Sequence, residues 1–393
     1  MRARKRILVL TPRYPYPVIG GDRLRIYEIC RQLAQRHELT LLSLCETREE
    51  MDAALPTDGI FTRIERFHLP KWRSFLNVMS ALPTRVPLQV AYYRSTAFRQ
   101  RILQLLPEFD CCLAHLIRTG HYVRQARIPT ILEMTDAISM NYQRARSLSK
   151  ARHLRASIYA VEASRLLEYE REVMNEFDLV TLVADTDRDF LLNGTHRAHV
   201  LVCSNGVNLD AMPFQDRRQS EPVIVFIGNM ASVQNLDACT YFAERVMPVI
   251  RKSIDCRFRI IGRISGKHAA RLRSYPDTEV CANVGDVAAA VGQARAGVAP
   301  IRVGAGIQNK ILEYMALGLP VVSSSIGLEG LAAHPGRDIL LADTPEQYAA
   351  QFSKLWNDQT LASQIGRAGF DYARENHSWP AKLAPLIERI ETL

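Results

Sequence analysis

Short apolar runs alternate with segments of helical periodicity along the whole chain. The runs have the length and the β-branched residues of buried strands. They cover residues 7–10, 39–44, 109–114, 128–134, 178–184 and 200–203 in the first half, and 223–228, 258–263, 280–284, 297–301 and 321–322 in the second. Helical spacing is found over residues 25–34, 151–177, 236–250, 307–318 and 380–393. The alternation predicts an α/β protein of two doubly wound domains that face one another across a cleft.

A polar segment separates the two halves. Residues 213–222 combine two prolines with charged and amide side chains, which is typical of an interdomain linker. We therefore divide the chain into an N-terminal domain of residues 1–205, a linker of residues 206–221, a C-terminal domain of residues 222–375 and a terminal helix within residues 376–393.

The most informative stretch is residues 297–330, GVAPIRVGAGIQNKILEYMALGLPVVSSSIGLEG. It predicts a strand, a glycine turn at residues 304–306, a helix that begins at Gly306 and Ile307, and a second strand. Glycines allow close approach of a ligand, and the start of a helix favours a phosphate. Lys310 can meet a second phosphate, and Glu313 on the same helix face can accept bonds from sugar hydroxyls. The pattern is typical of a sugar-nucleotide site, although a closely packed loop with a solvated Lys310–Glu313 pair is the alternative.

A dinucleotide site is a competing interpretation of the same turn. The G-x-G-x-x-G fingerprint requires a third glycine at the position that Asn309 occupies. The sequence therefore favours a nucleotide-sugar over a dinucleotide.

Further candidate residues follow strands of the first half. A proline-rich loop ends at Gly20 and Gly21 and leaves a phosphate-sized opening at the carboxyl edge of the predicted sheet, unless it is only a flexible turn. His115 ends the strand over residues 109–114, where an imidazole can bond a hydroxyl or pass a proton, although a lone histidine can also be structural. Glu133, Thr135 and Asp136 follow the next strand, as acceptor contacts or as helix caps.

The segment GAGIQNKILEYMALGLPVVSS resembles the donor-binding signature of GT-B glycosyltransferases, in particular the family 4-like enzymes of bacterial exopolysaccharide and lipopolysaccharide synthesis. The start, ILVLTPRYPYPVIGGDRLRIYEICRQLAQRHELTLLSL, resembles the first strand, Gly-Gly loop and helix of these enzymes. SNGVNLD and VFIGNMASVQNLDACTYFAERVMPVI resemble two further family segments. The resemblance covers nearly the whole chain and is closest to sugar transferases associated with exosortase systems.

The resemblance implies a GT-B fold of two Rossmann-like domains, with the terminal helix crossing back to the first. It also implies a role for individual residues. The donor diphosphate is assigned to Gly20, Gly21, Arg302, Gly306, Ile307 and Lys310, the ribose to Glu313, the nucleobase to Gly262, Arg263 and Val287, the transferred sugar to the catalytic His115, and the acceptor to Arg25 and Asp136.

Three positions depart from the family pattern. Ala305 stands where many family 4 enzymes have a glutamate, and Asn229 and Asn235 replace an arginine and a lysine that relatives place on the diphosphate. Each charge-assisted bond contributes about 1.5–3 kcal/mol, so another cation must substitute. Arg302 and Lys310 are the nearest candidates.

Composition agrees with a cytoplasmic globular protein. The chain has 393 residues, 47% apolar and 23% charged, and no apolar run of eighteen residues. The start MRARKRILVL leads directly into a strand without a cleavage site, which argues against a signal peptide. Eight cysteines without a C-x-x-C pair are expected to be buried thiols in a reducing compartment, and no zinc site is indicated.

The net charge of +9 is concentrated in residues 63–101. Aromatic and apolar side chains interleave with arginines there, which suits anionic lipid headgroups. We expect peripheral contact with the inner face of the cytoplasmic membrane, with a solvated basic face as the alternative. A nucleic-acid partner is not expected, because no motif for one is present.

The sequence therefore predicts a glycosyltransferase that moves a sugar from a nucleoside diphosphate sugar to a hydroxyl of a lipid-linked or polysaccharide acceptor. By the resemblance it retains the anomeric configuration and needs no metal or other cofactor. A nucleotide-sugar epimerase of the same fold and a non-catalytic scaffold are the alternatives.

Overall fold

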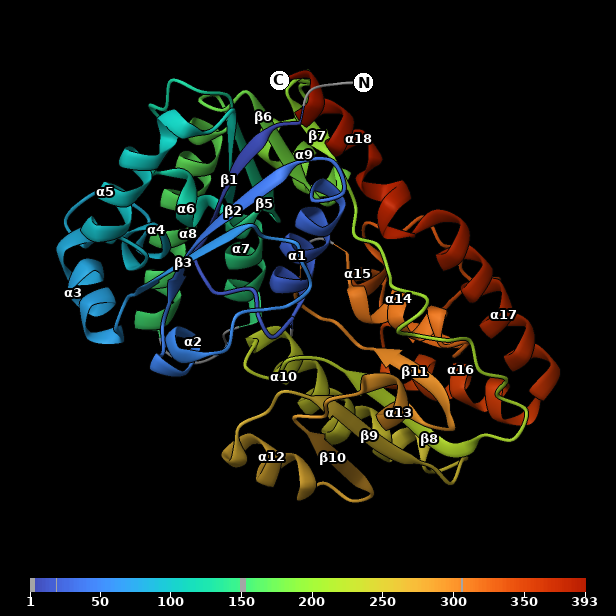
Figure 1. Ribbon diagram of the computed structural model, residues 1–393. Coiled ribbons are helices and arrows are strands. Elements are labelled where there is room, and N and C mark those ends of the chain that lie inside the picture. The colour runs from blue at the N-terminus through green and yellow to red at the C-terminus, as the bar shows by residue number, and fades with distance from the viewer. Residues whose placement is uncertain (1–3, 19, 149–152, 305–306) are drawn as a thin grey trace. The chain divides into compact units, whose positions relative to one another are not determined.

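The computed structural model describes residues 4–18, 20–148, 153–304 and 307–393. The chain forms two compact α/β units (Figure 1). The first comprises Met1–Ser204 together with Leu383–Leu393, and the second comprises Asn205–Lys382. The last residues of the chain thus group with the first unit.

The first unit is built on a seven-stranded sheet with the order β3-β2-β1-β4-β5-β6-β7. All of its strand pairs are parallel. The strands are β1 (Arg6–Thr11), β2 (Glu38–Cys45), β3 (Arg63–His68), β4 (Cys111–His115), β5 (Thr130–Thr135), β6 (Leu179–Leu182) and β7 (Val200–Val202). Every residue of β4 is buried, as expected for a central parallel strand covered on both faces.

The second unit repeats this plan with six parallel strands in the order β10-β9-β8-β11-β12-β13. The strands are β8 (Glu221–Ile227), β9 (Arg257–Gly262), β10 (Thr278–Ala282), β11 (Ala294–Ala299), β12 (Val321–Ser323) and β13 (Leu340–Leu341). In both sheets the second and third strands in chain order lie on one side of the first strand, which is β1 or β8. The remaining strands follow one another on its other side. This is the doubly wound arrangement that the sequence predicts.

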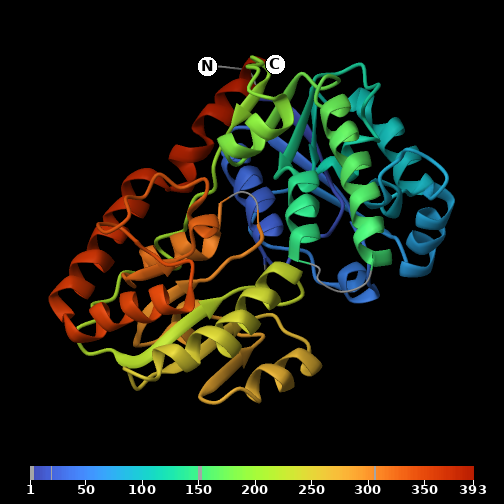
Figure 2. The same cartoon turned by 180° about the vertical axis from the view of Figure 1, so that it is seen from behind.

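Helices connect the parallel strands in both units, and α7 packs against α8 in the first (Figure 2). The helices of the first unit are α1 (Gly21–Leu33), α2 (Arg48–Asp52), α3 (Lys71–Ala81), α4 (Leu88–Tyr92), α5 (Thr96–Leu105), α6 (Ile117–Gly120), α7 (Ile138–Leu148), α8 (His153–Val173) and α9 (Asp185–Leu192), with a 3₁₀ turn at Leu106–Glu108. Those that follow are α10 (Val233–Tyr241), a π turn (Phe242–Val246), α11 (Met247–Ile250), α12 (Gly266–Arg273), α13 (Val287–Val291), α14 (Asn309–Ala316), α15 (Ser325–Leu328), α16 (Pro345–Asn357), α17 (Gln359–Asn376) and α18 (Trp379–Thr392).

Most predicted strands are confirmed, with ends that differ by a few residues. The predicted helix over residues 307–318 is corrected, because α14 begins only at Asn309 after an extended Gln308. Lys310 therefore lies in the first turn of the helix. The predicted helix over residues 236–250 begins earlier, at Val233, and contains the π turn.

Tyr314 of α14 ties the central strands of the second sheet together. Its hydroxyl accepts a hydrogen bond from the backbone N–H of Ile227 at 2.7 Å and donates to the carbonyl of Val298 at 3.2 Å. A Cβ on Gly297 would lie 2.6 Å from the Tyr314 ring, so this position of β11 has room for glycine alone. The contact fixes α14 against the ends of β8 and β11.

The segment SNGV packs against the chain just before and within α18. Val207 forms a bridge with Ser378 and its N–H donates to the carbonyl of His377 at 2.7 Å. A Cβ on Gly206 would lie 2.6 Å from the backbone nitrogen of Trp379, whose side chain is fully buried. These contacts hold the beginning of the second unit against the residues that lead into α18 and its first residue.

All eight cysteines lie in the described residues as thiols and not as disulfides, and all but the half-buried Cys281 are buried, as predicted. In the described part of the chain, helices of sufficient length and apolarity to cross a membrane are absent.

Replacing Gly297 with alanine should destabilise the protein by about 1–3 kcal/mol, because the added methyl group collides with the Tyr314 ring. Chemical denaturation measures the change. Gly285→Ala is the matched control, since a Cβ there has no heavy atom within 4 Å, and it should stay within about 0.5 kcal/mol of the wild type. Equal stability of the two variants would contradict the collision at the β11–α14 contact.

Candidate functional site

Strand order reverses once in each sheet, beside β1 in the first and beside β8 in the second. Ligands of doubly wound sheets bind outside the carboxyl ends of the strands at this reversal. In the first unit, the loop that ends at Gly20 follows β1 and His115 ends β4. In the second unit, Gly228 follows β8, and the loop before α14 follows β11. The topology therefore places several predicted site residues at the edge where a ligand is expected.

His115 is held by a buried carboxylate. Its Nδ1 lies 2.6 Å from Oε2 of Glu133, the residue paired with it across β4 and β5. Both side chains are buried. An ionised carboxylate can only accept a hydrogen bond, so Nδ1 carries the proton and donates it. The contact fixes the ring orientation and leaves Nε2 for another partner.

Arg25 of α1 completes this buried cluster. Its Nε donates to Oε1 of Glu133 at 2.5 Å, and both side chains are fully buried. Burial alone would raise the pKa of Glu133, but the Arg25 guanidinium and the hydrogen bond from His115 outweigh it and lower the pKa to about 2. Glu133 is therefore ionised throughout the physiological range, and it joins α1, β4 and β5 at one point.

Thr135, at the end of β5, also forms hydrogen bonds with the Glu133 carboxylate. Its backbone N–H donates to Glu133 at 3.0 Å, and its hydroxyl lies within hydrogen-bond distance of both carboxylate oxygens. The pairing of β5 with β6 shifts register between Glu133 and Thr135, and Thr135 has a φ of +65°. A strained backbone of this kind persists where the surroundings fix it, as the Glu133 contacts do here.

This arrangement gives two predicted acceptor contacts a structural role. Glu133 is fully buried and binds His115. Arg25 is fully buried and paired with Glu133, and its contact with an acceptor stays a prediction. Both residues position His115.

Further carboxyl groups surround the start of α7. Glu170 of α8 accepts from the backbone N–H groups of Ile138 and Ser139, at 2.7 and 3.3 Å, and from the Ser139 hydroxyl. Asp187 accepts from the N–H of Ala137 at 2.9 Å. These bonds satisfy N–H groups at the start of the helix, which have no partner within it.

Crowding of these carboxyl groups affects their ionisation. Burial raises the pKa of Glu170 to about 7 against the effect of its hydrogen bonds. Burial, and then the carboxylates of Asp187 and Glu133, raise the pKa of Asp136 well above its usual range. Asp136 is half-buried beside the His115 cluster, where its predicted contact with an acceptor stays a prediction.

In the second unit, Lys310 is a buried cation in the first turn of α14. Its Nζ donates to Oε1 of Gln308 at 3.0 Å and lies 5.4 Å from the centre of the Phe226 ring. Burial lowers the pKa of Lys310 to about 8, and the nearby Glu313 opposes that shift. Burial raises the pKa of Glu313, which Lys310 in turn opposes. Lys310 is buried and Glu313 is half-buried, so the two side chains are not the solvated pair of the alternative interpretation.

Arg302 has a different environment from Lys310. Its guanidinium makes two bonds to the Asp237 carboxylate, at 3.0 and 2.5 Å, and lies 4.5 Å from the centre of the Tyr241 ring. Of the other predicted diphosphate contacts, Gly20 lies at the start of α1 with a φ of +104°, Gly21 is the first residue of that helix, and Ile307 is buried. Gly306, like the departure at Ala305, lies outside the described residues.

Gly262 makes a close backbone contact at the ends of β8 and β9. It has a φ of +138°, and a Cβ there would lie 2.0 Å from the carbonyl oxygen of Gly228. Of the other predicted nucleobase contacts, Arg263 is exposed and Val287 is the half-buried first residue of α13. Whether these residues contact a base stays a prediction.

The two departures Asn229 and Asn235 shape the loop after β8. The Asn229 side chain accepts from the N–H of Ala231 at 3.0 Å, and Asn235 donates to the carbonyl of Asn229 at the same distance. Both amides therefore serve the local backbone. Lys310 remains a buried cation near this loop through its contact with Phe226 of β8.

Asn205 is a structural residue that sequence reasoning found only by resemblance. Its side-chain amide donates to Oδ1 of Asn309, the first residue of α14, at 2.8 Å. Its carbonyl lies 3.1 Å from Nδ1 of His377. Asn205 thus connects the start of the candidate donor helix with the segment that leads into α18.

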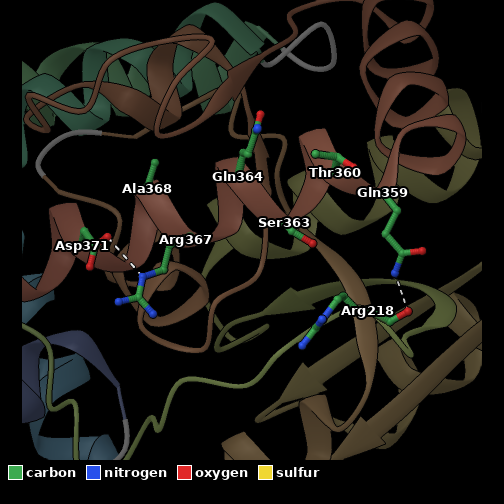
Figure 3. Close-up of a pocket in the computed structure, with 8 residues that line it drawn as sticks. All are labelled: Arg218, Gln359, Thr360, Ser363, Gln364, Arg367, Ala368 and Asp371. Atoms are coloured by element: carbon green, nitrogen blue, oxygen red, sulfur yellow. Dashed lines mark hydrogen bonds and ion pairs between the residues drawn. The ribbon is translucent and has the colours of Figure 1, made fainter.

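An open depression lies elsewhere on the second unit, on one side of α17 (Figure 3). Its polar groups bond to one another: Arg367 pairs with Asp371 at 3.2 Å, and Gln359 donates to the backbone of Arg218. The predicted donor residues do not line it. We assign it no role in the candidate site.

Comparison with protein families finds a match within the second unit. Residues 221–358, which include Lys310, Glu313 and the loop before them, match the family described as glycosyl transferases group 1. The match covers 138 of the 393 residues, so this segment is similar to a group 1 glycosyl transferase domain.

Solved structures of other proteins share the fold of the whole chain. Sucrose-phosphate synthase from Thermosynechococcus elongatus superposes with a TM-score of 0.75 at 14% identity, over 99% of both chains. The HepE protein of Anabaena, solved with UDP and glucose, superposes with a TM-score of 0.71 at 14% identity, over 99% of this chain and all of its own. Together with the two doubly wound sheets, these neighbours establish the GT-B fold.

A relative in sequence is an uncharacterized 44.6 kDa protein in the cps region of Klebsiella pneumoniae. It is 20% identical over 396 aligned positions, which cover 95% of this chain and 96% of that protein. This similarity therefore extends beyond residues 221–358, which match the group 1 family.

Replacing Glu133 with glutamine should destabilise the protein by about 3–5 kcal/mol, because it leaves the Arg25 guanidinium buried without its counter-ion. Thermal and chemical denaturation at neutral pH measure the loss. Glu65→Gln is the matched control, since Glu65 pairs with Arg101 at 2.8 Å near the surface, and it should cost at most about 1 kcal/mol. A Glu133 variant as stable as this control would contradict the proposed dependence on the buried pair.

Glu170 should make stability depend on pH in the opposite sense to Glu133. Its pKa in the folded state, about 7, lies above the ordinary 4.5, so its stabilising contribution is complete below pH 4.5 and is lost as pH rises through 7. From pH 5 to pH 8 the wild type should therefore lose stability relative to Glu170→Gln, by on the order of 3 kcal/mol at about 1.4 kcal/mol per pKa unit. If the free energies of unfolding of the two proteins change by the same amount between pH 5 and pH 8, Glu170 does not titrate in this range.

Proposed function

We propose that this chain transfers a sugar from a nucleoside diphosphate sugar to a hydroxyl group of a lipid-linked or polysaccharide acceptor. The observation that carries the proposal is the buried Lys310 in the first turn of α14, within the segment that matches the group 1 family. A desolvated cation at a helix start favours a ligand with concentrated negative charge, such as a diphosphate. HepE, which shares the fold, has been solved with UDP and with UDP-glucose, which favours a donor of this class.

The chemistry assigns a task to each group. When the bond between the anomeric carbon and the diphosphate breaks, positive charge develops on the sugar and negative charge on the leaving oxygen. Lys310 and the start of α14 would stabilise the leaving charge. Glu313 would bind the ribose, and His115, with Nδ1 fixed by Glu133, would offer Nε2 to the transferred sugar.

Arg302 would contribute only after a change of partner. In the structure its guanidinium is bound in two places by Asp237, so contact with a donor diphosphate requires exchange of one anion for another. Arginine suits such an exchange because its planar group binds carboxylate and phosphate in the same two-point geometry.

We further propose that transfer retains the anomeric configuration and needs no metal, as the resemblance implies. The bond from the anomeric carbon to the diphosphate breaks, a bond to the acceptor oxygen forms, and the acceptor proton passes to the leaving diphosphate. The relative in the cps region of Klebsiella pneumoniae favours a polysaccharide acceptor in cell-surface glycan synthesis.

Thermal-shift measurements with UDP-, GDP-, ADP- and dTDP-sugars test the donor site. One nucleotide class should stabilise the wild type, and Lys310→Ala should abolish that shift, whereas Lys354→Ala on the exposed side of α16 should retain it. Affinity should also fall as pH rises above 8, because the donor anion binds the protonated form of Lys310, whose pKa is about 8. Lys310→Arg stays charged across this range, so its affinity for the donor should not fall above pH 8.

Product analysis separates this function from the alternatives. A transferase should hydrolyse its donor slowly without an acceptor and form a glycoside with one, whereas an epimerase would return a changed nucleotide sugar. Binding without turnover, or no shift with any nucleotide, would favour a non-catalytic scaffold and contradict the proposal.

A further inference from the structure

Helix α3 presents an apolar face to solvent. Trp72, Phe75, Leu76 and Met79 are 62%, 61%, 56% and 48% exposed, and Leu82 just after the helix is 46% exposed. Figure 1 shows α3 beside α4 at the periphery of the first unit, and the two helices are in contact. Single exposed apolar residues are common, but a group of this size on one helix indicates an interaction surface.

The exposed side chains follow helical periodicity. At ~100° per residue, Trp72, Phe75, Leu76 and Met79 fall within an arc of about 100° on the helix surface. The opposite side, with the buried Ser74 and Ala81, packs on the unit. Since the packed side carries small side chains and the outward side carries the large apolar ones, the pattern cannot be explained by packing within the unit.

Cations border this apolar face and carboxylates are absent from it. Between Glu65 and Glu108 the sequence has no Asp or Glu, and it has seven Lys or Arg residues: Arg66, Lys71, Arg73, Arg85, Arg94, Arg99 and Arg101. Two of them have structural partners, since Arg66 donates to backbone carbonyls of residues 50 and 53 and Arg101 pairs with Glu65. Lys71 and Arg73 are exposed on α3 and flank its apolar face from its two sides.

We propose that α3 is a membrane-docking helix that lies in the interface of an anionic lipid bilayer, with Trp72, Phe75, Leu76 and Met79 inserted among the acyl chains and Lys71 and Arg73 at the headgroups. Apolar side chains between cations, on a helix of eleven residues that is too short to cross a bilayer, are the features of an interfacial helix. Apart from Arg66 and Arg101, which have structural partners, the stretch between Glu65 and Glu108 contributes five cations and no carboxylate. This charge complements an anionic surface and not a protein surface of mixed charge. The proposal does not depend on the transferase activity.

Vesicle binding tests the proposal on the full chain. Wild type should co-sediment with phosphatidylcholine vesicles that contain about 30 mol% phosphatidylglycerol and bind much more weakly to phosphatidylcholine alone. Phe75→Ser/Leu76→Ser should lower the partition coefficient at least about tenfold. Leu103→Ser/Val233→Ser is the matched control, because it also removes two exposed apolar side chains, on α5 and α10, and it should bind like the wild type.

The charged residues have a separate test. Lys71→Gln/Arg73→Gln should lower binding to the anionic vesicles and reduce its sensitivity to salt. Lys267→Gln/Arg271→Gln, which removes two exposed cations from α12, should leave both unchanged. If the two variants lose binding equally, net charge alone explains the attraction and the docking role of α3 is overturned.

Tryptophan fluorescence reports the depth of insertion. Trp379 is fully buried and Trp356 is half-buried, whereas Trp72 is 62% exposed. Anionic vesicles should therefore shift the emission to shorter wavelength, and Trp72→Phe should remove the shift. An unshifted spectrum in the presence of bound vesicles would overturn insertion of this face.

Two controls separate membrane docking from unfolding and from self-association. All variants should retain the wild-type melting temperature and nucleotide response, so loss of vesicle binding is not loss of folding or of the proposed donor site. Light scattering gives the oligomeric state. If the wild type self-associates through α3, and Phe75→Ser/Leu76→Ser dissociates it while no variant binds vesicles, the face is a contact between copies and the membrane proposal is wrong.

Discussion

Parallel strands cannot be joined by tight turns, and this constraint determines where both units of the protein can act. Each return to the other end of the sheet needs a crossover, so the helices cover the faces and the loops collect at the strand ends. Where the strand order reverses, beside β1 and again beside β8, neighbouring crossovers diverge to opposite faces. His115 and the loop before α1 lie at the first reversal, and the approach to the Lys310 helix lies at the second. The same geometric solution, used twice, places candidate site residues in each unit.

The buried charged side chains have different neighbours in the two candidate site regions. In the first unit, Arg25, Glu133 and His115 satisfy one another in the interior, and the cluster is closed to solvent on the Arg25 side. Such a cluster contributes little net stability compared with an apolar one, but it is strongly destabilised when one partner is lost. In the second unit, Lys310 is buried with an amide oxygen and an aromatic ring as neighbours, which satisfy a cation only partly. The first arrangement fixes an orientation, while the second retains affinity for an anion.

The sequence predicted those features that depend on local pattern. Continuous apolar runs identified the buried parallel strands, and the position of His115 at the end of such a run made it a candidate site residue. The edge strand β3, RIERFH, was missed because its side chains are mostly half-buried and charged, and α3 was noticed only as interleaved basic and apolar residues. The ion pair between Glu133 and Arg25, 108 residues apart in sequence, could not be predicted, because residue spacing carries no information on contacts between distant elements. The start of α14 differed by two residues because the extended Gln308 uses its side chain to bind Lys310.

The final residues of the chain complete the first unit. Leu383–Leu393 group with that unit, where the carbonyl of Ile390 accepts a bond from Lys5 at 3.0 Å and Glu391 pairs with Arg36 at 2.9 Å. A ribosome releases these residues only after the entire second unit has been synthesised, although domains otherwise tend to fold in order of synthesis. Until the second unit has been synthesised, the first unit therefore lacks the contacts that Lys5 and Arg36 make with this segment.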